Sequence, residues 1–157
     1  MTEGIYLGFD FSYRKIGVAS GQSLTKSATA LTTIKGVDGQ PDWTQISTII
    51  DQWNPKALII GLPLAMDGEE QKMTQAAREF GQALSNRYHL PIYFMDERLS
   101  SREASHLLGY DGHTSPRRVN RKGKKVKKQH RQGENIDSKA AELILQSWLN
   151  QQAFFKS

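Results

Sequence analysis

The sequence predicts a single α/β domain in which a five-stranded mixed sheet is flanked by helices. Three observations predict this class. Three strand-like segments joined by turns come first, strand-like and helix-like segments then alternate, and an amphipathic segment closes the chain. A chain of 157 residues is long enough for one hydrophobic core and short for two. We therefore expect residues 1–157 to form one domain with one site.

The first three strands are expected to pair in antiparallel fashion. Residues 5–9 are almost continuously apolar and lead into Asp10, and residues 16–19 follow after a polar turn. A third strand-like segment covers residues 28–34. Short apolar segments separated by turn residues typically pair as hairpins, so Asp10 is expected where the first strand ends.

A helix and a buried strand are expected next. Asp42 is a suitable N-cap with Gln45 three residues later, and Asn54 followed by Pro55 ends the helix. Residues 57–60 are wholly apolar, which is typical of a parallel strand buried on both faces. This strand and a later one are therefore expected to extend the three antiparallel strands in parallel.

A longer helix is expected over about residues 68–88. Asp67 is its candidate N-cap, with Glu70 at the third helical position. The helical period places four apolar residues on the face that should turn inward: Met73, Ala77, Phe80 and Leu84.

The fifth strand is expected over residues 92–95. Asp96 and Glu97 follow it directly, so two carboxylates should emerge at its C-terminal end. A capping-box pattern beginning at Ser100 then predicts a short helix that closes at Gly109.

One segment carries most of the positive charge. The formal net charge is +5, yet nine Lys or Arg residues lie between positions 117 and 131 without an acid among them, and the remaining 12 basic and 16 acidic residues give −4. Residues 110–135 also lack hydrophobic periodicity, which predicts a flexible basic loop ahead of a final helix that begins near Asp137. A solvated or targeting segment is the alternative. The predicted nucleic-acid contacts are Arg117, Arg118, Arg121, Lys122, Lys124, Lys125, Lys127, Lys128 and Arg131.

Several kinds of site are absent from the sequence. No cysteine is present, which excludes disulfides, thiolate zinc sites and cysteine nucleophiles. The four histidines are scattered, and no Gly-x-Gly-x-x-Gly, P-loop or Gly-x-Ser-x-Gly motif occurs, so no nucleotide cofactor is predicted. Gly8, Gly17 and Gly61 are expected instead to allow close backbone packing at the sheet.

A cytoplasmic protein without a membrane segment is expected. No apolar run approaches the roughly 18 residues that span a bilayer. The first residues have neither the positive nor the apolar region of a secretory signal.

The carboxylates indicate a metal-dependent hydrolysis of phosphodiesters. Asp10 and Glu97 follow strands, and Asp137 shares a helix face with the apolar residues at i+4, i+7 and i+11. Carboxylates are the ligands that Mg²⁺ or Mn²⁺ prefers, and such an ion neutralises phosphoryl charge and supplies hydroxide near neutral pH. We expect Asp10, Glu97 and Asp137 to hold the ion, with Asp96 as an additional candidate ligand.

Each carboxylate also has a purely structural interpretation. Asp137 would cap the last helix, although Ala140 at the third position does not suit a capping box. Asp10 would open a turn after its strand, and Glu97 would pair with Arg98 or lie in a solvated turn. The sequence taken residue by residue leaves these alternatives open.

Four motifs together resemble the YqgF family of Holliday junction resolvase-like proteins. They are Gly8-Phe-Asp10-Phe-Ser-Tyr-Arg-Lys-Ile-Gly17-Val-Ala19, Gly61-Leu-Pro63-Leu-Ala-Met-Asp67-Gly68, Asp96-Glu97-Arg98-Leu-Ser, and Asp137-Ser-Lys-Ala140-Ala141 with Ile144-Leu-Gln. The resemblance implies an RNase H-like fold related to junction resolvases and a bacterial nuclease that matures the 5′ end of precursor 16S rRNA. It also implies that Asp10, Glu97 and Asp137 form the acidic site.

The chain departs from the family pattern at two places. The family usually has Gly where this chain has Ser12, in the turn that aims Asp10. The family's basic loop before the last acid is also generally shorter. The longer loop here is expected to alter how the substrate is bound and not the chemistry of cutting.

Three hypotheses for the function follow. The first is a Mg²⁺- or Mn²⁺-dependent nuclease acting on precursor rRNA, which the resemblance favours, or on branched DNA. The second is a non-catalytic module that binds RNA, the ribosome or the transcription machinery. The third, an actin-like ATPase, ranks last because a second domain is missing. A monomer and a homodimer both fit, and junction cutting favours the dimer.

Overall fold

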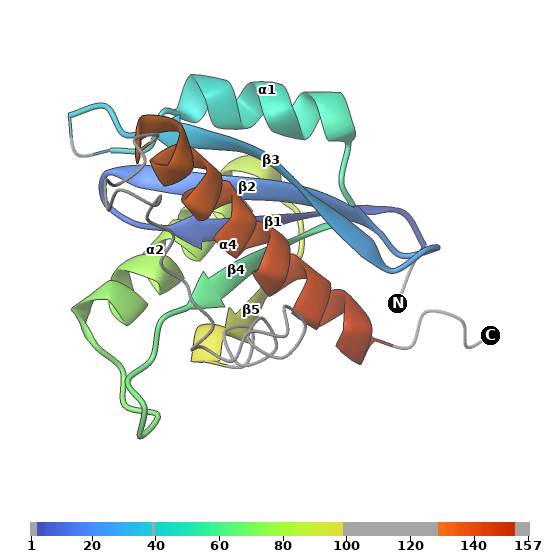
Figure 1. Cartoon of the computed structure of the whole chain (residues 1–157). Helices are drawn as coiled ribbons and strands as arrows, with labels where there is room; N and C mark the ends of the chain where they lie inside the picture. Colours follow the sequence, from blue (N-terminus) through green and yellow to red (C-terminus); the bar gives the residue numbers. More distant parts are fainter. Residues whose placement is uncertain (1–2, 39, 99–128, 153–157) are drawn as a thin grey trace, which may run out of the picture.

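A five-stranded sheet organises the protein, as the computed structural model shows for residues 3–38, 40–98 and 129–152 (Figure 1). The strand order is β3-β2-β1-β4-β5. β1 pairs antiparallel with β2, and β2 with β3, while β1–β4 and β4–β5 are parallel. This confirms the predicted mixed sheet. The strands are β1 Ile5–Phe11, β2 Lys15–Gln22, β3 Ser27–Lys35, β4 Ala57–Leu62 and β5 Ile92–Asp96.

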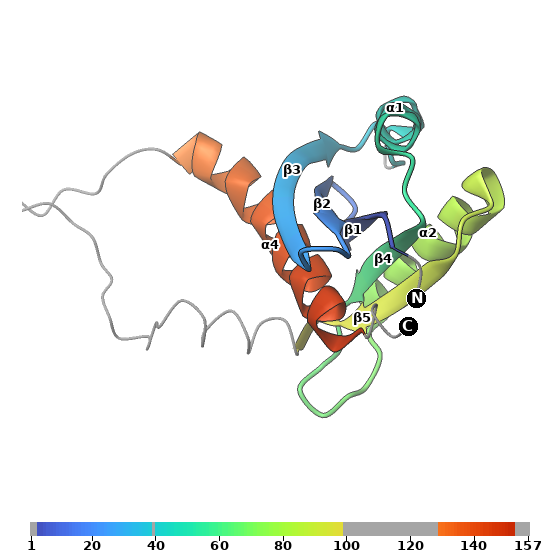
Figure 2. The ribbon, with the colours of Figure 1, turned by 90° about the vertical axis from the view of Figure 1, so that its right-hand side faces the viewer.

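Helices cover both faces of the sheet (Figure 2). α1 Trp43–Trp53 and α2 Lys72–Tyr88 pack on one face, where Phe9, Ile60 and Phe80 lie in an apolar core. α4 Gln129–Gln151 packs on the other, against Ile59 and its neighbours. The two cores are separate because successive residues of a strand point to opposite faces.

The first helix has the predicted ends. Asp42 caps α1 by accepting a hydrogen bond from the Gln45 amide, and Asn54 ends the helix in the left-handed conformation. α2, by contrast, begins later than predicted, with Gln71 and Thr74 as its capping box instead of Asp67 and Glu70.

The late start of α2 has a local cause. Gly68 has a φ of +90°, and its amide donates to the Ala65 carbonyl, so the chain turns there. Asp67 accepts from the Glu69 amide within this turn, and Glu70 then forms a β-bridge to Leu64. A short hairpin therefore occupies the place of the first predicted helical turns.

α4 begins at Gln129, eight residues before the predicted start near Asp137. Residues 129–135 carry no apolar side chain, so hydrophobic periodicity could not reveal these turns. The backbone of Arg131 thus lies in α4 and not in a loop. The predicted short helix ending at Gly109, and the part of the basic loop over residues 110–128, lie outside the described residues.

Candidate metal centre

Asp10 faces α4 from the end of β1. It is the last residue but one of the strand and pairs with Gly17 of β2. Strand alternation places it on the same face as Tyr6, which packs in the α4 core, while Phe9 and Phe11 point to the opposite face. The turn that follows is closed by Ser12, whose hydroxyl donates to the Lys15 carbonyl over 2.7 Å. Ser12 is not among the described residues with positive φ, so serine suits this turn.

A glycine opposite Asp10 lets α4 approach the sheet. A Cβ on Gly17 would lie 1.9 Å from the Asp137 carbonyl oxygen, closer than any real contact. Gly8 makes a second close approach, because a Cβ there would lie 2.8 Å from the Leu145 Cβ. The prediction that these glycines serve close packing is confirmed, and the packing brings Asp137 next to Asp10.

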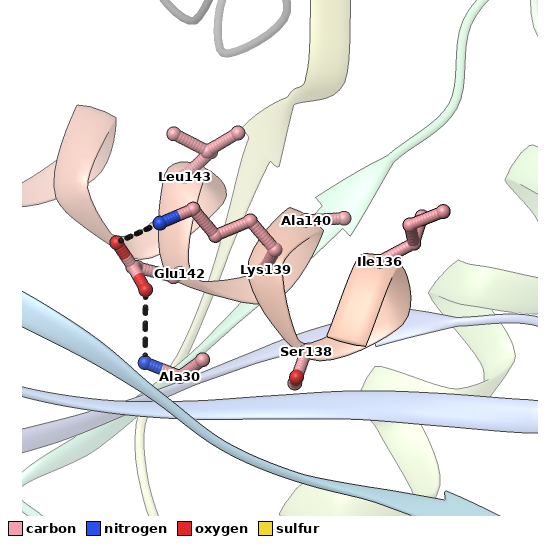
Figure 3. Close-up of a pocket in the computed structure, with 7 residues that line it drawn as sticks. All are labelled: Ala30, Ile136, Ser138, Lys139, Ala140, Glu142 and Leu143. Atoms are coloured by element: carbon pink, nitrogen blue, oxygen red, sulfur yellow. Dashed lines mark hydrogen bonds and ion pairs between the residues drawn. The ribbon is translucent and has the colours of Figure 1, made fainter. Parts of the chain in front are cut away.

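Polar contacts fix α4 along β3 (Figure 3). Glu142 accepts a hydrogen bond from the Ala30 amide over 3.0 Å, and Lys139 Nζ pairs with the same carboxylate at 3.1 Å. Gln146 accepts from the Ala28 amide one turn later. A hollow of about 730 Å³ lies beside this contact and includes the exposed Ile136 in its lining. The anchored helix holds the adjacent Asp137 in place.

Glu97 lies directly after β5 and contacts Asp10. Their carboxyl groups share a side-chain hydrogen bond. Gly61 on the neighbouring strand leaves the room for it, since a Cβ there would lie 2.7 Å from Glu97 Oε2. The alternative interpretation paired Glu97 with Arg98, and the ion pair that the structure shows for Arg98 is with Asp96.

The shared hydrogen bond comes with raised pKa values. Burial raises the pKa of Asp10 to about 6, with the hydrogen bond from Glu97 opposing this rise and the charge of Asp137 adding to it. Burial and the Asp10 carboxylate raise the pKa of Glu97 to about 8. At neutral pH the pair therefore holds one proton between two buried oxygens. Such a pair favours a cation, which would take the place of that proton.

Asp137 approaches the pair from α4. It lies on the face that also carries Ala141, Ile144 and Trp148, all buried, as the helical period predicted. Its Oδ2 atom is buried, lies 3.3 Å from Lys15 Nζ and accepts no hydrogen bond. Because α4 begins well before it, Asp137 is not the N-cap, and that alternative is wrong.

Asp96 has a different partner from the other three carboxylates. It accepts hydrogen bonds from the Arg98 amide and guanidinium, at 2.9 and 2.7 Å respectively. Arg98 also donates to the Met66 carbonyl over 2.9 Å, which ties the end of β5 to the loop before α2. Asp96 thus anchors that loop, and its charge adds to the rise in the pKa of Glu97.

The donor set fits a hard divalent cation. Three carboxylates from three elements meet around Asp10, and one of their buried oxygens has no hydrogen bond. Within the described residues, no group of three His, Asp or Glu side chains is already arranged to hold an ion. These residues would hold a divalent ion only if Asp137 gave up its ion pair with Lys15.

Sequence reasoning missed Lys15. The residue begins β2, and its contact with Asp137 joins positions 122 residues apart in the chain. No local pattern signals such a contact, although the register that pairs Asp10 with Gly17 places Lys15 at the same edge of the sheet. Of the nine predicted basic contacts, the eight from Arg117 to Lys128 lie outside the described residues.

The arrangement of the strands defines the class of fold. A sheet of three antiparallel strands extended by two parallel ones, with helices on both faces, is an RNase H-like fold. The same fold occurs in a solved structure described as Thermus thermophilus RuvC in complex with Holliday junction substrate. That likeness has a TM-score of 0.50 at 11% identity and covers 93% of each chain.

Sequence comparison then identifies the family. Residues 4–151 match the family model described as "RuvX: Holliday junction resolvase", and the chain belongs to this family. A protein of Nitrosococcus oceani named "Putative pre-16S rRNA nuclease" is 49% identical over 94% of this chain and 88% of its own length. One of the same name from Legionella pneumophila strain Paris is 46% identical over 96% and 99%. The YqgF resemblance is thereby confirmed.

Crossing a bilayer requires a helix of about 20 mostly apolar residues. Over residues 3–38, 40–98 and 129–152, none is long and apolar enough to cross a membrane.

Proposed function

We propose that this protein is a Mg²⁺- or Mn²⁺-dependent nuclease that processes the 5′ end of precursor 16S rRNA in the cytoplasm. The names of its relatives support the substrate. The observation that supports the metal dependence is the contact of Asp10 with Glu97, together with the buried Oδ2 of Asp137, which accepts no hydrogen bond. Two buried carboxyls that share a proton would otherwise only destabilise the fold.

Asp10, Glu97 and Asp137 would hold the ion. When bound, a divalent cation neutralises charge on the phosphoryl oxygens and lowers the pKa of water. Glu97 would hold the ion as a carboxylate, without the proton that it shares with Asp10. Lys15 holds the Asp137 carboxylate in an ion pair when no metal is bound. Asp96 stays with Arg98 and positions Glu97 from the end of β5.

The nine cations from Arg117 to Arg131 would grip the substrate backbone. Their charge offsets the repulsion between a phosphate and the acidic site, and the binding needs no base-specific readout. Substituting the eight cations up to Lys128 by Gln is expected to weaken binding and to flatten its salt dependence. The log-log slope should fall by about 0.7 for each phosphate that is no longer neutralised on a single strand. An unchanged slope would show that these residues do not touch the backbone.

The decisive experiment compares two substrates. A precursor 16S rRNA 5′ leader and a four-way DNA junction are incubated with the protein in Mg²⁺, Mn²⁺ or EDTA. We expect cutting of the leader in either metal and none in EDTA. Preferential cutting of the junction would favour the alternative that the family description supports, a Holliday junction resolvase, for which a homodimer is expected.

Matched variants decide whether the site is correctly assigned. Asp10→Asn removes one charge at the site, and Asp51→Asn removes one from an exposed position on α1. We expect Asp10→Asn to reduce cutting by at least about 10²-fold while remaining folded, and Asp51→Asn to cut like the wild type. If neither substrate is cut by wild type, the chain is instead a binding module for RNA, the ribosome or the transcription machinery.

A further inference from the structure

An aromatic hollow lies beside the turn between β1 and β2, on the face opposite to Asp10. It measures about 180 Å³, below the roughly 300–1,000 Å³ of pockets for drug-sized ligands, so it suits a single ring system. Its described lining includes Phe11, Tyr13, Trp43 and Phe80. These side chains come from the end of β1, the turn, α1 and α2, far apart in sequence.

The rings form a supported stack with Tyr13 at its outer end. Phe80 stacks on Phe11 at 4.8 Å between centroids and on Trp43 at 6.0 Å. Tyr13 meets Phe11 edge to face at 5.9 Å, and 57% of Tyr13 is exposed. Packing thus fixes the base of the stack and leaves the tyrosine ring accessible to a planar ligand.

Cations lie on the other side of the same turn. Tyr13 also lines an adjoining hollow of about 460 Å³, whose other described lining residues are Arg14, Lys15, Lys35 and Gly36. All its charged residues in the described part of the chain are basic. Lys15 and Lys35 are direct partners across β2 and β3, and like charges so placed destabilise a sheet. Asp137 forms an ion pair with Lys15. A bound anion next to Lys35 would reduce the remaining repulsion between the two lysines.

The two hollows select different parts of a ligand. The aromatic hollow has Gln40 and Glu79 in its lining, and a carboxylate there repels a phosphate but accepts a hydrogen bond from an amino group. The cationic hollow has the opposite preference. A ligand that satisfies both has a planar ring with donor groups and, next to it, a phosphate.

We propose that the aromatic hollow and the adjoining cations bind an unpaired nucleotide of the nucleic-acid substrate, with its base on Tyr13 and its phosphates at Arg14 and Lys35. This inference rests on the proposed nuclease function. Tyr13 is three residues from Asp10, so their Cα atoms are at most about 11 Å apart. Lys15 contacts both the cationic hollow and Asp137. A short single strand can therefore reach from the acidic site over the turn.

The site implies a substrate class. Bases within a duplex are stacked on their neighbours and cannot lie on a tyrosine, whereas single-stranded segments can splay a base out. The protein should thus prefer a single-stranded segment beside the bond it cuts over a fully paired one. Docking of a protein partner on the same aromatic side chains is the competing use of this surface.

The test measures binding in EDTA, so that it does not depend on cutting. Single-stranded RNA oligonucleotides carry 2-aminopurine at one position each, and a blunt duplex of the same sequence serves as the comparison ligand. Stacking on Tyr13 should quench the fluorescence at one or two positions of the single strand. Tyr13→Ala should weaken binding about 5- to 100-fold and abolish that quenching, and Tyr13→Phe should restore both.

Matched controls separate this site from general surface effects. Leu24→Ala removes an apolar side chain that is 63% exposed in the turn between β2 and β3. Lys56→Gln removes an exposed cation next to the start of β4. Both should bind like the wild type, whereas Lys35→Gln should reduce the log-log salt slope by about 0.7.

The outcomes distinguish this inference from the proposed function. Single-strand binding that is unchanged in Tyr13→Ala, or absent in the wild type, overturns the inference even if the enzyme cuts RNA. Duplex binding that depends equally on Tyr13 overturns it as well, as does a Tyr13-dependent capture of protein without any nucleotide quenching. Tyr13-dependent quenching in a protein that cuts neither substrate supports the inference as a binding site and refutes the nuclease.

Discussion

The two faces of the sheet differ in how they pack and in the groups that they bury. On the face covered by α1 and α2, large apolar side chains such as Ile60 and Phe80 pack together. On the face covered by α4, the packing depends on glycines, and carboxylates lie at its edge. Ile59 and Ile60, adjacent in β4 and both fully buried, each belong to one face.

The difference shows how stability and function are divided. Burial of apolar area on the α1–α2 face stabilises the fold with no cost in charge. The α4 face buries Asp10 and Glu97, whose raised pKa values reflect how unfavourable their charged forms are. We infer that apolar packing on the α1–α2 face offsets the cost of burying the acidic site on the α4 face.

The largest expected effect comes from breaking the apolar face. Ile60→Ala should lower the free energy of unfolding by about 2–5 kcal/mol, because the surrounding side chains cannot fill the cavity. Denaturation in urea measures it, with Met66→Ala, at a residue that is 86% exposed, as the control that should change little. Cutting by the folded fraction of Ile60→Ala should stay near wild type. A strong decrease there would mean that the two faces are not separable.

The next effect comes from the close approach on the other face. Gly17→Ala should cost about 1–3 kcal/mol and also abolish cutting, because the new Cβ meets the backbone of Asp137 and pushes α4 away from Asp10. Gly61→Ala is the comparison. The atoms nearest to its Cβ belong to the side chains of Ile144 and Glu97 and not to the backbone, and side chains can move more easily. It should therefore reduce activity with a smaller decrease in stability, and equal destabilisation of both variants would contradict this account.

A smaller effect concerns pH. In the unfolded chain Asp10 and Glu97 release their protons near their ordinary pKa values of 3.8 and 4.5, whereas in the fold they hold them to about 6 and 8. Between these limits the folded state binds more protons, so its stability should fall as pH rises from 5 to 8. In EDTA we expect the Tm to fall over this range, and thermal melts at each pH measure the decrease.

Variants and metal test the source of that pH dependence. Asp10→Asn should reduce the dependence of the Tm on pH. At pH 8 in EDTA the variant should also be more stable than wild type, because Glu97 no longer has a charged neighbour at position 10. Mg²⁺ or Mn²⁺ should raise the Tm of wild type at pH 8 more than that of the variant. A wild-type Tm that rises with pH in EDTA would show that the fold does not raise the pKa values of Asp10 and Glu97.

Much of the fold and part of the site could be predicted from sequence because their signals are local. Asp10 and Glu97 follow apolar strands, and parallel strands and hairpins gather such ends at one edge. The α2 start was mispredicted because Asp67 and Glu70 have the spacing of a capping box, while the turn at Gly68 and the bridge from Glu70 to Leu64 are tertiary outcomes.

The interactions that complete the site are long-range and have no local signal. Gly17 was predicted to pack closely, but its partner, the backbone of Asp137, emerged only from the fold. The same holds for Lys15, whose partner Asp137 is far away in the sequence. The choice of Asp96 over Glu97 as the partner of Arg98 is local, but both acids lie close to Arg98 in the sequence, so the sequence does not decide between them.

The smallest expected effect is that of the Lys15–Asp137 ion pair. The pair is partly exposed at 3.3 Å, and such pairs contribute about 0–1 kcal/mol. Lys15→Met also removes the like-charged neighbour of Lys35, so its net cost should be below about 0.5 kcal/mol. A double-mutant cycle with Asp137→Asn isolates the coupling, with Lys139→Met and Asp137→Asn as the uncoupled control cycle. Coupling above about 2 kcal/mol would mean that Lys15 locks Asp137 in place, and Asp137 would then not exchange this partner for a metal ion.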